Sequence, residues 1–231
     1  MSYQHIDYIG NAIDLPVGKV VCIGQNYLDH IQDMNSKTAA EALFFIKPST
    51  ALVPMAPRFI IPSSQGAVHN ETEIAVLLKA PLKKASVSEV LAAVWGYSLA
   101  LDLTLREVQA QLKQLGRPWE IAKGFDGACP VAGFVPADLV ADPQQLQFAL
   151  TVNEHTRQQG DARFMIRGIA QMLSEMSQHF TLLAGDLVLT GTPAGVGPLQ
   201  QADQLELTML PWLRVQTQVD NSAELSSEEQ S

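Results

Sequence analysis

Three carboxylic acids and one lysine stand where the sequence is otherwise apolar. Glu71 and Glu73 precede a long apolar run, Asp102 ends another, and Lys123 lies in the run Ile-Ala-Lys-Gly-Phe. Burying a charged group costs several kcal/mol unless it is paired or bound to a metal. Because alternate side chains of a strand share one face, we expect Glu71 and Glu73 to point the same way, together with His69. A divalent cation would explain both the acids and their spacing.

Oxygen ligands from two glutamates and one aspartate suit a hard ion, whereas zinc prefers histidine and cysteine. We therefore expect Mg²⁺, with Mn²⁺ or Ca²⁺ as alternatives. The ammonium of Lys123 would neutralise the third negative charge and hold a substrate oxyanion. From the sequence alone, the glutamate pair can also be the exposed polar end of a strand, and Lys123 a solvated lysine.

Polar side chains follow Asp102 at helical spacing. Arg106 and Gln109 come four and seven residues later, which places all three on one helical face. Leu105 and Leu112 lie on a different face, so this helix would bury one stripe and present acid, guanidinium and amide along another. A solvated polar face is the alternative.

A glycine-rich segment, Leu189–Gly197, follows a predicted strand. It matches neither of the glycine motifs that cradle phosphates, GxxxxGKS/T and GxGxxG. We expect a tight turn that offers backbone amides and the hydroxyls of Thr190 and Thr192 to a carboxylate. An ordinary loop is the alternative.

The elements that must position these residues are mostly short strands. Apolar runs and alternation predict strands at 19–24, 42–46, 68–78, 94–102, 146–152, 186–190 and 204–209. Helical patterns cover 86–93, 103–115 and 161–180, and the prolines between 48 and 62 exclude helix there. Strands outnumber helices and do not alternate with them regularly, so we expect a strand-rich α+β fold.

Composition bounds the class of protein. Charged residues make up 17% of the 231 residues, below the usual share of about a quarter, which favours an oligomer. The net charge is −9 and the longest basic cluster is one pair of lysines, so nucleic-acid binding is not expected. The two cysteines suggest neither a disulfide nor a zinc site. We find no signal-peptide pattern and no long apolar span, and expect a soluble, cytoplasmic protein.

The chain divides into three parts. Residues 1–18 read as a lead-in, 19–218 as one catalytic domain, and 219–231 as an acidic, disordered tail.

Six segments, taken in order, resemble the fumarylacetoacetate hydrolase family over roughly residues 19–210. They are Cys22–His30, Phe45–Pro48, His69–Glu73, Asp102–Gln109, Trp119–Asp126 and Leu189–Gly197. The chain is most similar to the single-domain branch of acylpyruvate hydrolases and oxaloacetate decarboxylases. The resemblance implies mixed sheets wrapped into a β-sandwich roll with few short helices, a homodimer, and Mg²⁺ or Mn²⁺ in the site.

The same matching implies roles for individual residues. Glu71, Glu73 and Asp102 correspond to the metal ligands. Substrate would be surrounded by a second set, namely Lys123, Arg106, Gln109 and Thr192. His30 with Asp33 corresponds to the pair that activates water.

The implied chemistry is carbon–carbon cleavage in a small 2-oxo acid through an enolate: hydrolysis of an acylpyruvate to pyruvate and a carboxylic acid. Oxaloacetate decarboxylation, and keto–enol tautomerisation or isomerisation, share that intermediate and stay as alternatives. A protein that binds metal and oxo acid without turnover is the alternative of another class.

Three positions depart from the family pattern. Asp33 stands where glutamate is frequent and is one methylene shorter, which affects hydrolysis more than decarboxylation. Gln25 stands where many members have arginine. Asn153, Glu154 and His155 replace an Asn-Gly-Glu hairpin, so this turn must manage without the easy positive φ of glycine.

Overall fold

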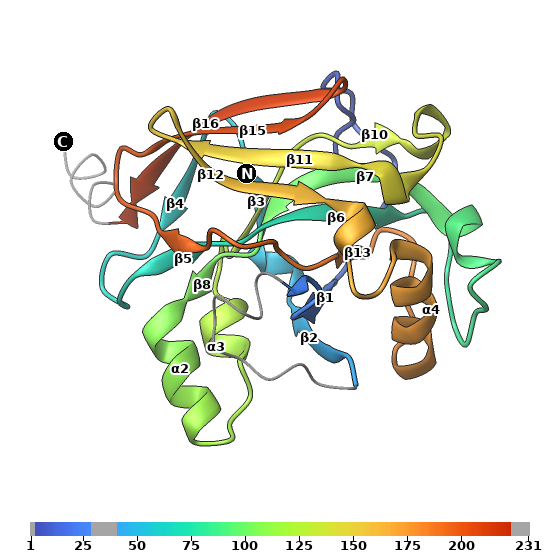
Figure 1. Cartoon of the computed structure of the whole chain (residues 1–231), viewed down its shortest axis with the longest axis horizontal. Coiled ribbons are helices and arrows are strands. Elements are labelled where there is room, and N and C mark those ends of the chain that lie inside the picture. The colour runs from blue at the N-terminus through green and yellow to red at the C-terminus, as the bar shows by residue number, and fades with distance from the viewer. Residues whose placement is uncertain (1–2, 29–40, 223–231) are drawn as a thin grey trace.

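The computed structural model describes residues 3–28 and 41–222, and strands dominate it (Figure 1). The strands are β1 (Val20–Gly24), β2 (Leu43–Lys47), β3 (Leu52–Pro54), β4 (Arg58–Ile61), β5 (Val68–Asn70), β6 (Thr72–Leu78), β7 (Val94–Leu101), β8 (Thr104–Leu105), β9 (Cys129–Val131), β10 (Val135–Pro136), β11 (Gln147–Val152), β12 (His155–Asp161), β13 (Leu187–Leu189), β14 (Gly197–Pro198), β15 (Gln204–Met209) and β16 (Leu213–Asn221). The α-helices are α2 (Arg106–Gln114), α3 (Glu120–Lys123) and α4 (Ile169–His179). Short 3-10 turns are η1 (Ser49–Ala51), η2 (Val90–Ala93), η3 (Ala137–Leu139), η4 (Pro143–Gln145) and η5 (Ala162–Phe164). The strand-rich α+β class expected from the sequence is therefore confirmed.

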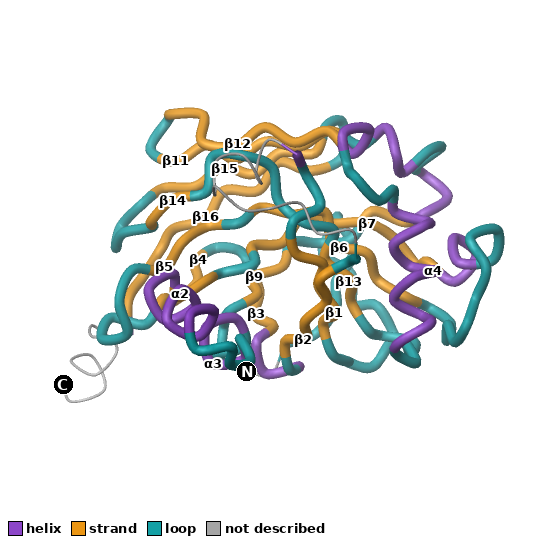
Figure 2. The backbone as a smooth tube through the Cα atoms, turned by 60° about the horizontal axis from the view of Figure 1, so that its bottom comes forward, coloured by secondary structure: helices purple, strands orange, loops and turns teal. Residues whose placement is uncertain are grey.

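The strands form three sheets of mixed direction. The largest has the order β2-β1-β13-β6-β7-β9-β3, with β10 added beside β7. A five-stranded sheet, β12-β11-β15-β16-β4, packs across it, and a small sheet, β14-β5-β8, lies between the two (Figure 1). Figure 2 shows α4 along one flank, with α2 and α3 together on the other. The chain thus wraps its sheets into a roll around the strand pair β6–β7.

Strand β6 explains why the roll is stable. All seven of its residues are buried, and its side chains serve two cores in alternation. Ile74 and Val76 pack with the apolar face of the five-stranded sheet, whereas Ala75 and Leu77 pack with β1 and β9 on the other face. A strand buried on both faces needs a continuous apolar run, which this one has. Each large side chain buried here stabilises the fold by roughly 1.5–3 kcal/mol.

Three expectations on helices were wrong in part, and several strands were missed. The helix predicted from residue 103 begins at Arg106, because Thr104 and Leu105 stay extended and pair with β5. The helix predicted at 86–93 is only the turn η2, although Ser86 N–H does donate to Glu89 Oε2 at 2.9 Å as in a capping box. The helix predicted at 161–180 is split into η5 and α4, with Gly168 before α4. Besides β8, seven strands were not predicted, namely β3, β4, β9, β10, β12, β14 and β16.

The two ends of the domain also differ from the expectation. Residues 3–18 contribute to the core, since His5 and Ile13 are buried and Asp7 bridges to Phe134. Strand β16 continues to Asn221, past the boundary expected at 218, because its residues 218–221 pair with β4. None of the helices in the described ranges is long and apolar enough to span a membrane.

Candidate active site

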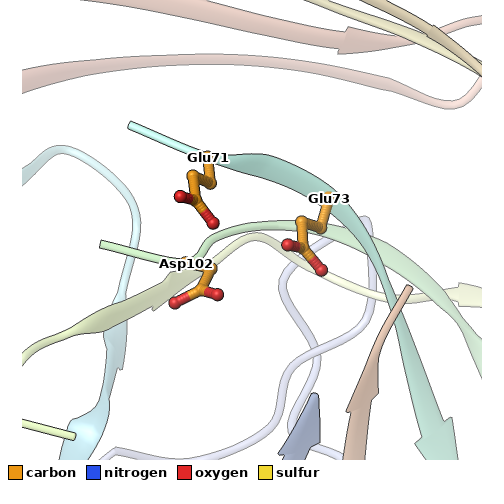
Figure 3. Close-up of side chains that lie close together, drawn as sticks. All are labelled: Glu71, Glu73 and Asp102. Carbon is orange, nitrogen blue, oxygen red and sulfur yellow. The ribbon is translucent and has the colours of Figure 1, made fainter. Parts of the chain in front are cut away.

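The break between β5 and β6 presents the two glutamates. Strand β5 pairs with β14 and β8, whereas β6 pairs with β7 and β13, so the chain passes from one sheet to another at Glu71. The extended backbone keeps the alternation of side chains through this break. As a result Glu71 and Glu73 point to the same side (Figure 3).

The neighbouring strand supplies the third acid. Thr72 pairs with Leu101 at the end of β7, and the next residue, Asp102, donates its N–H to Glu71 O at 2.8 Å. The carboxylates of Glu71, Glu73 and Asp102 are all buried, and one oxygen from each lies within 4.8 Å of the others (Figure 3).

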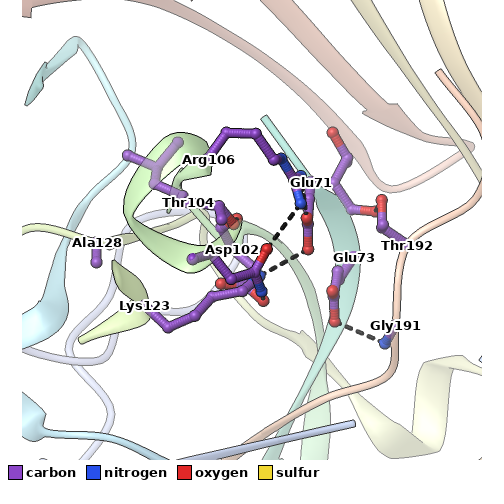
Figure 4. A network of polar contacts seen from close by, with 12 residues as sticks. Glu71, Glu73, Asp102, Thr104, Arg106, Lys123, Ala128, Gly191 and Thr192 are labelled. Carbon is purple, nitrogen blue, oxygen red and sulfur yellow. Dashed lines mark hydrogen bonds and ion pairs between the residues drawn. The ribbon is translucent and has the colours of Figure 1, made fainter. Parts of the chain in front are cut away.

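Three cationic side chains surround these acids. Lys123 Nζ, from the last residue of α3, is 2.8 Å from Glu71 Oε2 and 2.7 Å from Asp102 Oδ2. Arg106 Nη2, from the first turn of α2, is 2.6 Å from Glu71 Oε1 (Figure 4). Lys47 Nζ approaches Asp102 Oδ1 to 2.7 Å from the opposite side. The acids are therefore tolerated in the interior because an equal number of cations faces them.

Glu73 differs from its two neighbours. Its Oε2 accepts a hydrogen bond of 2.6 Å from Gly191 N–H, in the loop after β13 (Figure 4). Burial raises the pKa of Glu73 well above its usual range, and the charges of Asp102 and Glu71 raise it further, while Lys123 opposes the shift in part. A positive charge placed among the three carboxylates would favour the ionised form of this acid.

Lys123 keeps its proton despite burial. Loss of water around the ammonium acts to lower its pKa, but the carboxylates of Asp102 and Glu71 outweigh burial and raise the pKa above its usual range. Beside these two carboxylates Lys123 is thus a buried positive charge.

The donor set fits a divalent cation. Three carboxylates converge, and hard ions prefer oxygen ligands of this kind. Asp102 Oδ1 receives no well-directed hydrogen bond from the described residues, although Lys47 lies at ion-pair distance, so this oxygen keeps lone pairs for another partner. Glu71, Glu73 and Asp102 are the residues that could hold the ion.

The carboxylates form the floor of a cleft. Arg106 and Thr192 line it, and so does Gln109, whose Oε1 accepts from Arg106 Nη1 at 2.9 Å. Gln25 lines the cleft with a left-handed backbone, φ 60°. The remaining lining residues are Ile23, Gly24, Phe45, Lys113, Trp119 and Lys123. Thus the structure brings together seven of the predicted site residues: Glu71, Glu73, Asp102, Arg106, Gln109, Lys123 and Thr192. His30 and Asp33 lie outside the described residues.

Comparison with models of known protein families identifies the family of this chain. The family model for the fumarylacetoacetate hydrolase C-terminal domain matches residues 19–222. This chain belongs to the fumarylacetoacetate hydrolase family. The resemblance seen in the sequence is therefore confirmed, together with the fold that it implied.

Several relatives of this hydrolase-family chain have names that state an activity. Oxaloacetate tautomerase YcgM of Escherichia coli K12 is 50% identical over 89% of this chain and 94% of its own length. The mitochondrial oxaloacetate tautomerase of Homo sapiens is 40% identical over 81% of this chain and 85% of its own. Named members of the family are thus enzymes.

Solved structures of the family have the same fold. A fumarylacetoacetate hydrolase family protein of Yersinia pestis CO92 superimposes with a TM-score of 0.92 at 50% identity, covering 94% of this chain and all of the other. A fumarylpyruvate hydrolase of Pseudomonas aeruginosa, solved with Mn²⁺ and pyruvate, gives 0.89 at 30% identity, covering 96% and 97%.

Two residues of this hydrolase-family site were missed from the sequence. Lys47 belongs to one of the matched segments but received no role, and a lysine inside an apolar strand was the available signal. Gln158 has no comparable signal, since it sits in a polar run of β12 and reaches the site only through the fold. Lys47 and Gln158 contact residues that line the cleft, but neither of them lines it.

Proposed function

We propose that this chain is a divalent-metal-dependent enzyme that interconverts the keto and enol forms of oxaloacetate. The cluster of three buried carboxylates, matched by three cations at the floor of the cleft, carries the proposal. The identity of 50% with an oxaloacetate tautomerase supports this reaction over the hydrolysis that the sequence alone favoured. Mg²⁺ is the proposed ion, and Mn²⁺ is supported by the Pseudomonas structure.

Charge balance supports a dianionic substrate. Among the described residues, the charges of three ionised acids and of the three cations around them cancel, so a divalent ion would leave two positive charges there. Oxaloacetate carries two carboxylates and would neutralise them. Lys113, exposed at the cleft wall, adds a further positive charge that favours entry of anions.

The ion and the chain divide the chemistry. A divalent ion held by the three acids would act as a Lewis acid on the oxygens of a 2-oxo acid. Lys123 stays protonated and stabilises negative charge that develops on the substrate. Arg106 uses one nitrogen for Glu71 and another for Gln109, which fixes its plane and leaves further N–H groups for a substrate carboxylate.

Tautomerisation also needs a group that moves a proton at the carbon between the two carbonyl functions. Lys123 is ion-paired with Glu71 and Asp102, and we assign it the role of a positive charge beside the substrate. We assign the proton transfer to His30, oriented by Asp33, as the resemblance implies. In this reaction His30 acts on the substrate directly, so the shorter reach of Asp33 matters less than it would for activating a water molecule.

Acylpyruvate hydrolysis is the second candidate. The observation that favours it is the similarity to the Pseudomonas fumarylpyruvate hydrolase over nearly the whole chain. Its product, pyruvate, would use the same ion and the same cations. The two reactions differ in whether water attacks a distal carbonyl.

Three assays on purified protein with Mg²⁺ separate the candidates. Oxaloacetate dissolved as the enol should lose its ultraviolet absorbance faster with the protein, without release of pyruvate. Pyruvate formed from oxaloacetate would indicate decarboxylation, and pyruvate formed from acetylpyruvate would indicate hydrolysis. Tight oxalate binding without turnover of either substrate would mean a binding protein and would contradict the proposal.

We also propose a homodimer, on the low content of charged residues. Light scattering after size exclusion should give about twice the mass of the 25.1 kDa chain. A mass of one chain at micromolar concentration would contradict this.

A further inference from the structure

Gln158 on β12 is a buried amide that uses its full capacity for hydrogen bonds. Its Oε1 accepts from Asn70 Nδ2 at 2.8 Å and from Thr72 N–H at 2.9 Å. Its Nε2 donates to Thr192 Oγ1 at 2.8 Å and to Pro193 O at 3.0 Å. Only 1% of the residue is exposed.

The orientation of this amide follows from its partners. A backbone N–H can only donate, so the group facing Thr72 must be the oxygen. A backbone carbonyl can only accept, so the group facing Pro193 must be the NH₂. Two independent partners therefore agree on the same orientation, and an exchange of the oxygen and nitrogen would break both bonds.

The four bonds join two segments that present site residues. Asn70 and Thr72 are the neighbours of Glu71, at the break where the chain passes between sheets. Thr192 and Pro193 belong to the loop after β13, whose Gly191 N–H holds Glu73. Gln158 thus stands between the strand with the glutamates and the loop whose Thr192 lines the cleft.

The same bonds determine what Thr192 offers to a ligand. Its hydroxyl donates to Thr72 O at 2.9 Å, since that carbonyl can only accept. One of its lone pairs takes the N–H of Gln158. The proton and one lone pair are then in use, and the hydroxyl of this cleft-lining residue keeps one acceptor position.

We propose that Gln158 is a positioning residue of this site: it ties the neighbours of Glu71 to the Thr192 loop and presents the Thr192 hydroxyl as a hydrogen-bond acceptor. A ligand group that donates a proton, such as the hydroxyl of an enol or of a 2-hydroxy acid, fits this acceptor. A carboxylate oxygen, which has no proton, does not. This inference rests on the proposed function, because an enol hydroxyl is what distinguishes the two forms of oxaloacetate.

The first test separates positioning from a purely structural role. Gln158→Met keeps the length of the side chain and removes all four bonds, while Gln159→Met changes the exposed neighbour on the same strand. For Gln158→Met we expect Mn²⁺ affinity to fall about fivefold and the KM for oxaloacetate to rise about tenfold, with a smaller change in kcat. Gln159→Met should leave both quantities within about twofold of wild type. A lowered melting temperature with unchanged Mn²⁺ affinity and KM would overturn the proposal.

The second test asks whether the Thr192 hydroxyl accepts a hydrogen bond from the ligand. It does not require Gln158→Met to fold. Thr192→Val keeps the shape and removes the hydroxyl. In calorimetric titrations of the Mn²⁺-loaded protein, glycolate affinity should fall about tenfold, and oxalate affinity should change less than about twofold. Equal losses for the two acids, or a larger loss for oxalate, would contradict the assignment.

A combined variant tests whether Gln158 acts through Thr192. Adding Gln158→Met to Thr192→Val should reduce glycolate affinity little beyond the loss from Thr192→Val alone, because the two residues share one interaction. Fully additive losses would show independent roles. These titrations need no turnover, so wild-type protein that binds Mn²⁺ and both acids but leaves oxaloacetate unchanged would refute the proposed function and not this inference.

Discussion

Asp102 has two sides, and a buried lysine faces each of them. On the side of the cleft, Lys123 contacts Asp102 and Glu71 and lines the cavity. On the side of the core, Lys47 contacts Asp102 together with three backbone carbonyls, those of Leu103, Ala128 and Lys123. The two side chains have the same chemistry and the same partner, yet only Lys123 is among the described residues that line the cleft.

The comparison shows that the surroundings of a buried lysine determine whether its loss affects mainly stability or mainly activity. Lys47 contacts oxygen atoms that belong to several segments, so its removal leaves three carbonyls and Oδ1 of Asp102 without this buried cation, while Lys123 still pairs with Oδ2. Lys123 faces a cleft where water, an ion or a substrate can replace it. We therefore expect the first lysine to govern stability and the second to govern chemistry.

Lys47→Met should give the largest effect. Loss of the ion pair with Asp102 Oδ1 and of the bonds to three buried carbonyls should lower the free energy of unfolding by about 3–5 kcal/mol, because buried polar atoms are left unsatisfied. Urea unfolding followed by circular dichroism measures this. Lys79→Met, at an exposed lysine, is the matched control and should change stability by less than about 0.5 kcal/mol. An equally small loss of stability for Lys47→Met would contradict the role of Lys47 in holding the core.

Lys123→Met should reduce activity more than any loss of folding explains. Removal of one preorganised positive group typically lowers kcat by about 10²–10³-fold, and we expect this range for oxaloacetate with Mg²⁺. Mg²⁺ should raise the melting temperature of this variant more than that of Lys47→Met, because an ion can take over charge compensation only on the side of the cleft. Equal recovery of both variants with Mg²⁺ would remove the distinction between the two sides.

Glu73→Gln tests whether the cleft beside Asp102 contains a metal site. The substitution keeps the shape and removes one charge from the group of three, so Mn²⁺ affinity should fall at least about tenfold. Titration calorimetry measures it, with Glu206→Gln on the exposed side of β15 as the control. If Mn²⁺ affinity and turnover both stayed at the wild-type level, the ligand assignment would be wrong.

The sequence was sufficient where a local pattern decides the structure. Strand alternation placed Glu71 and Glu73 on one side, and the apolar run after them predicted the doubly buried β6. The turn at Asn153 and Glu154 was expected to manage without glycine, and both residues do have positive φ, 48° and 67°. Asn153 compensates through its side chain, which bonds Asp203 and Gln204 N–H.

The sequence was insufficient where partners come from distant segments. Lys47 meets Asp102 across 55 positions, and Gln158 meets Thr72 across 86, so no window of the chain contains either pair. Helical spacing also placed the start of α2 too early, because leucines at 103 and 105 suit a helix and a strand equally. Pairing of Thr104 and Leu105 with β5 decides for the strand, and this pairing is tertiary.

His5 is a buried base with no carboxylate partner among the described residues, so its pKa should shift in the opposite direction to that of Lys123, with the smallest effect on stability. Burial lowers the pKa of His5, although hydrogen bonds to Gly185 O and Pro16 oppose it, whereas the acids beside Lys123 reverse the effect of burial. The unfolded chain therefore binds a proton at about pH 6.5 that the folded chain resists. The stability held by neutral His5 is complete above this pH and is lost as the pH falls toward the lowered value. His5→Gln cannot titrate, so the difference in unfolding free energy between wild type and this variant should shrink from pH 8 to pH 5. A difference that stays constant over this range would show that His5 titrates alike in both states.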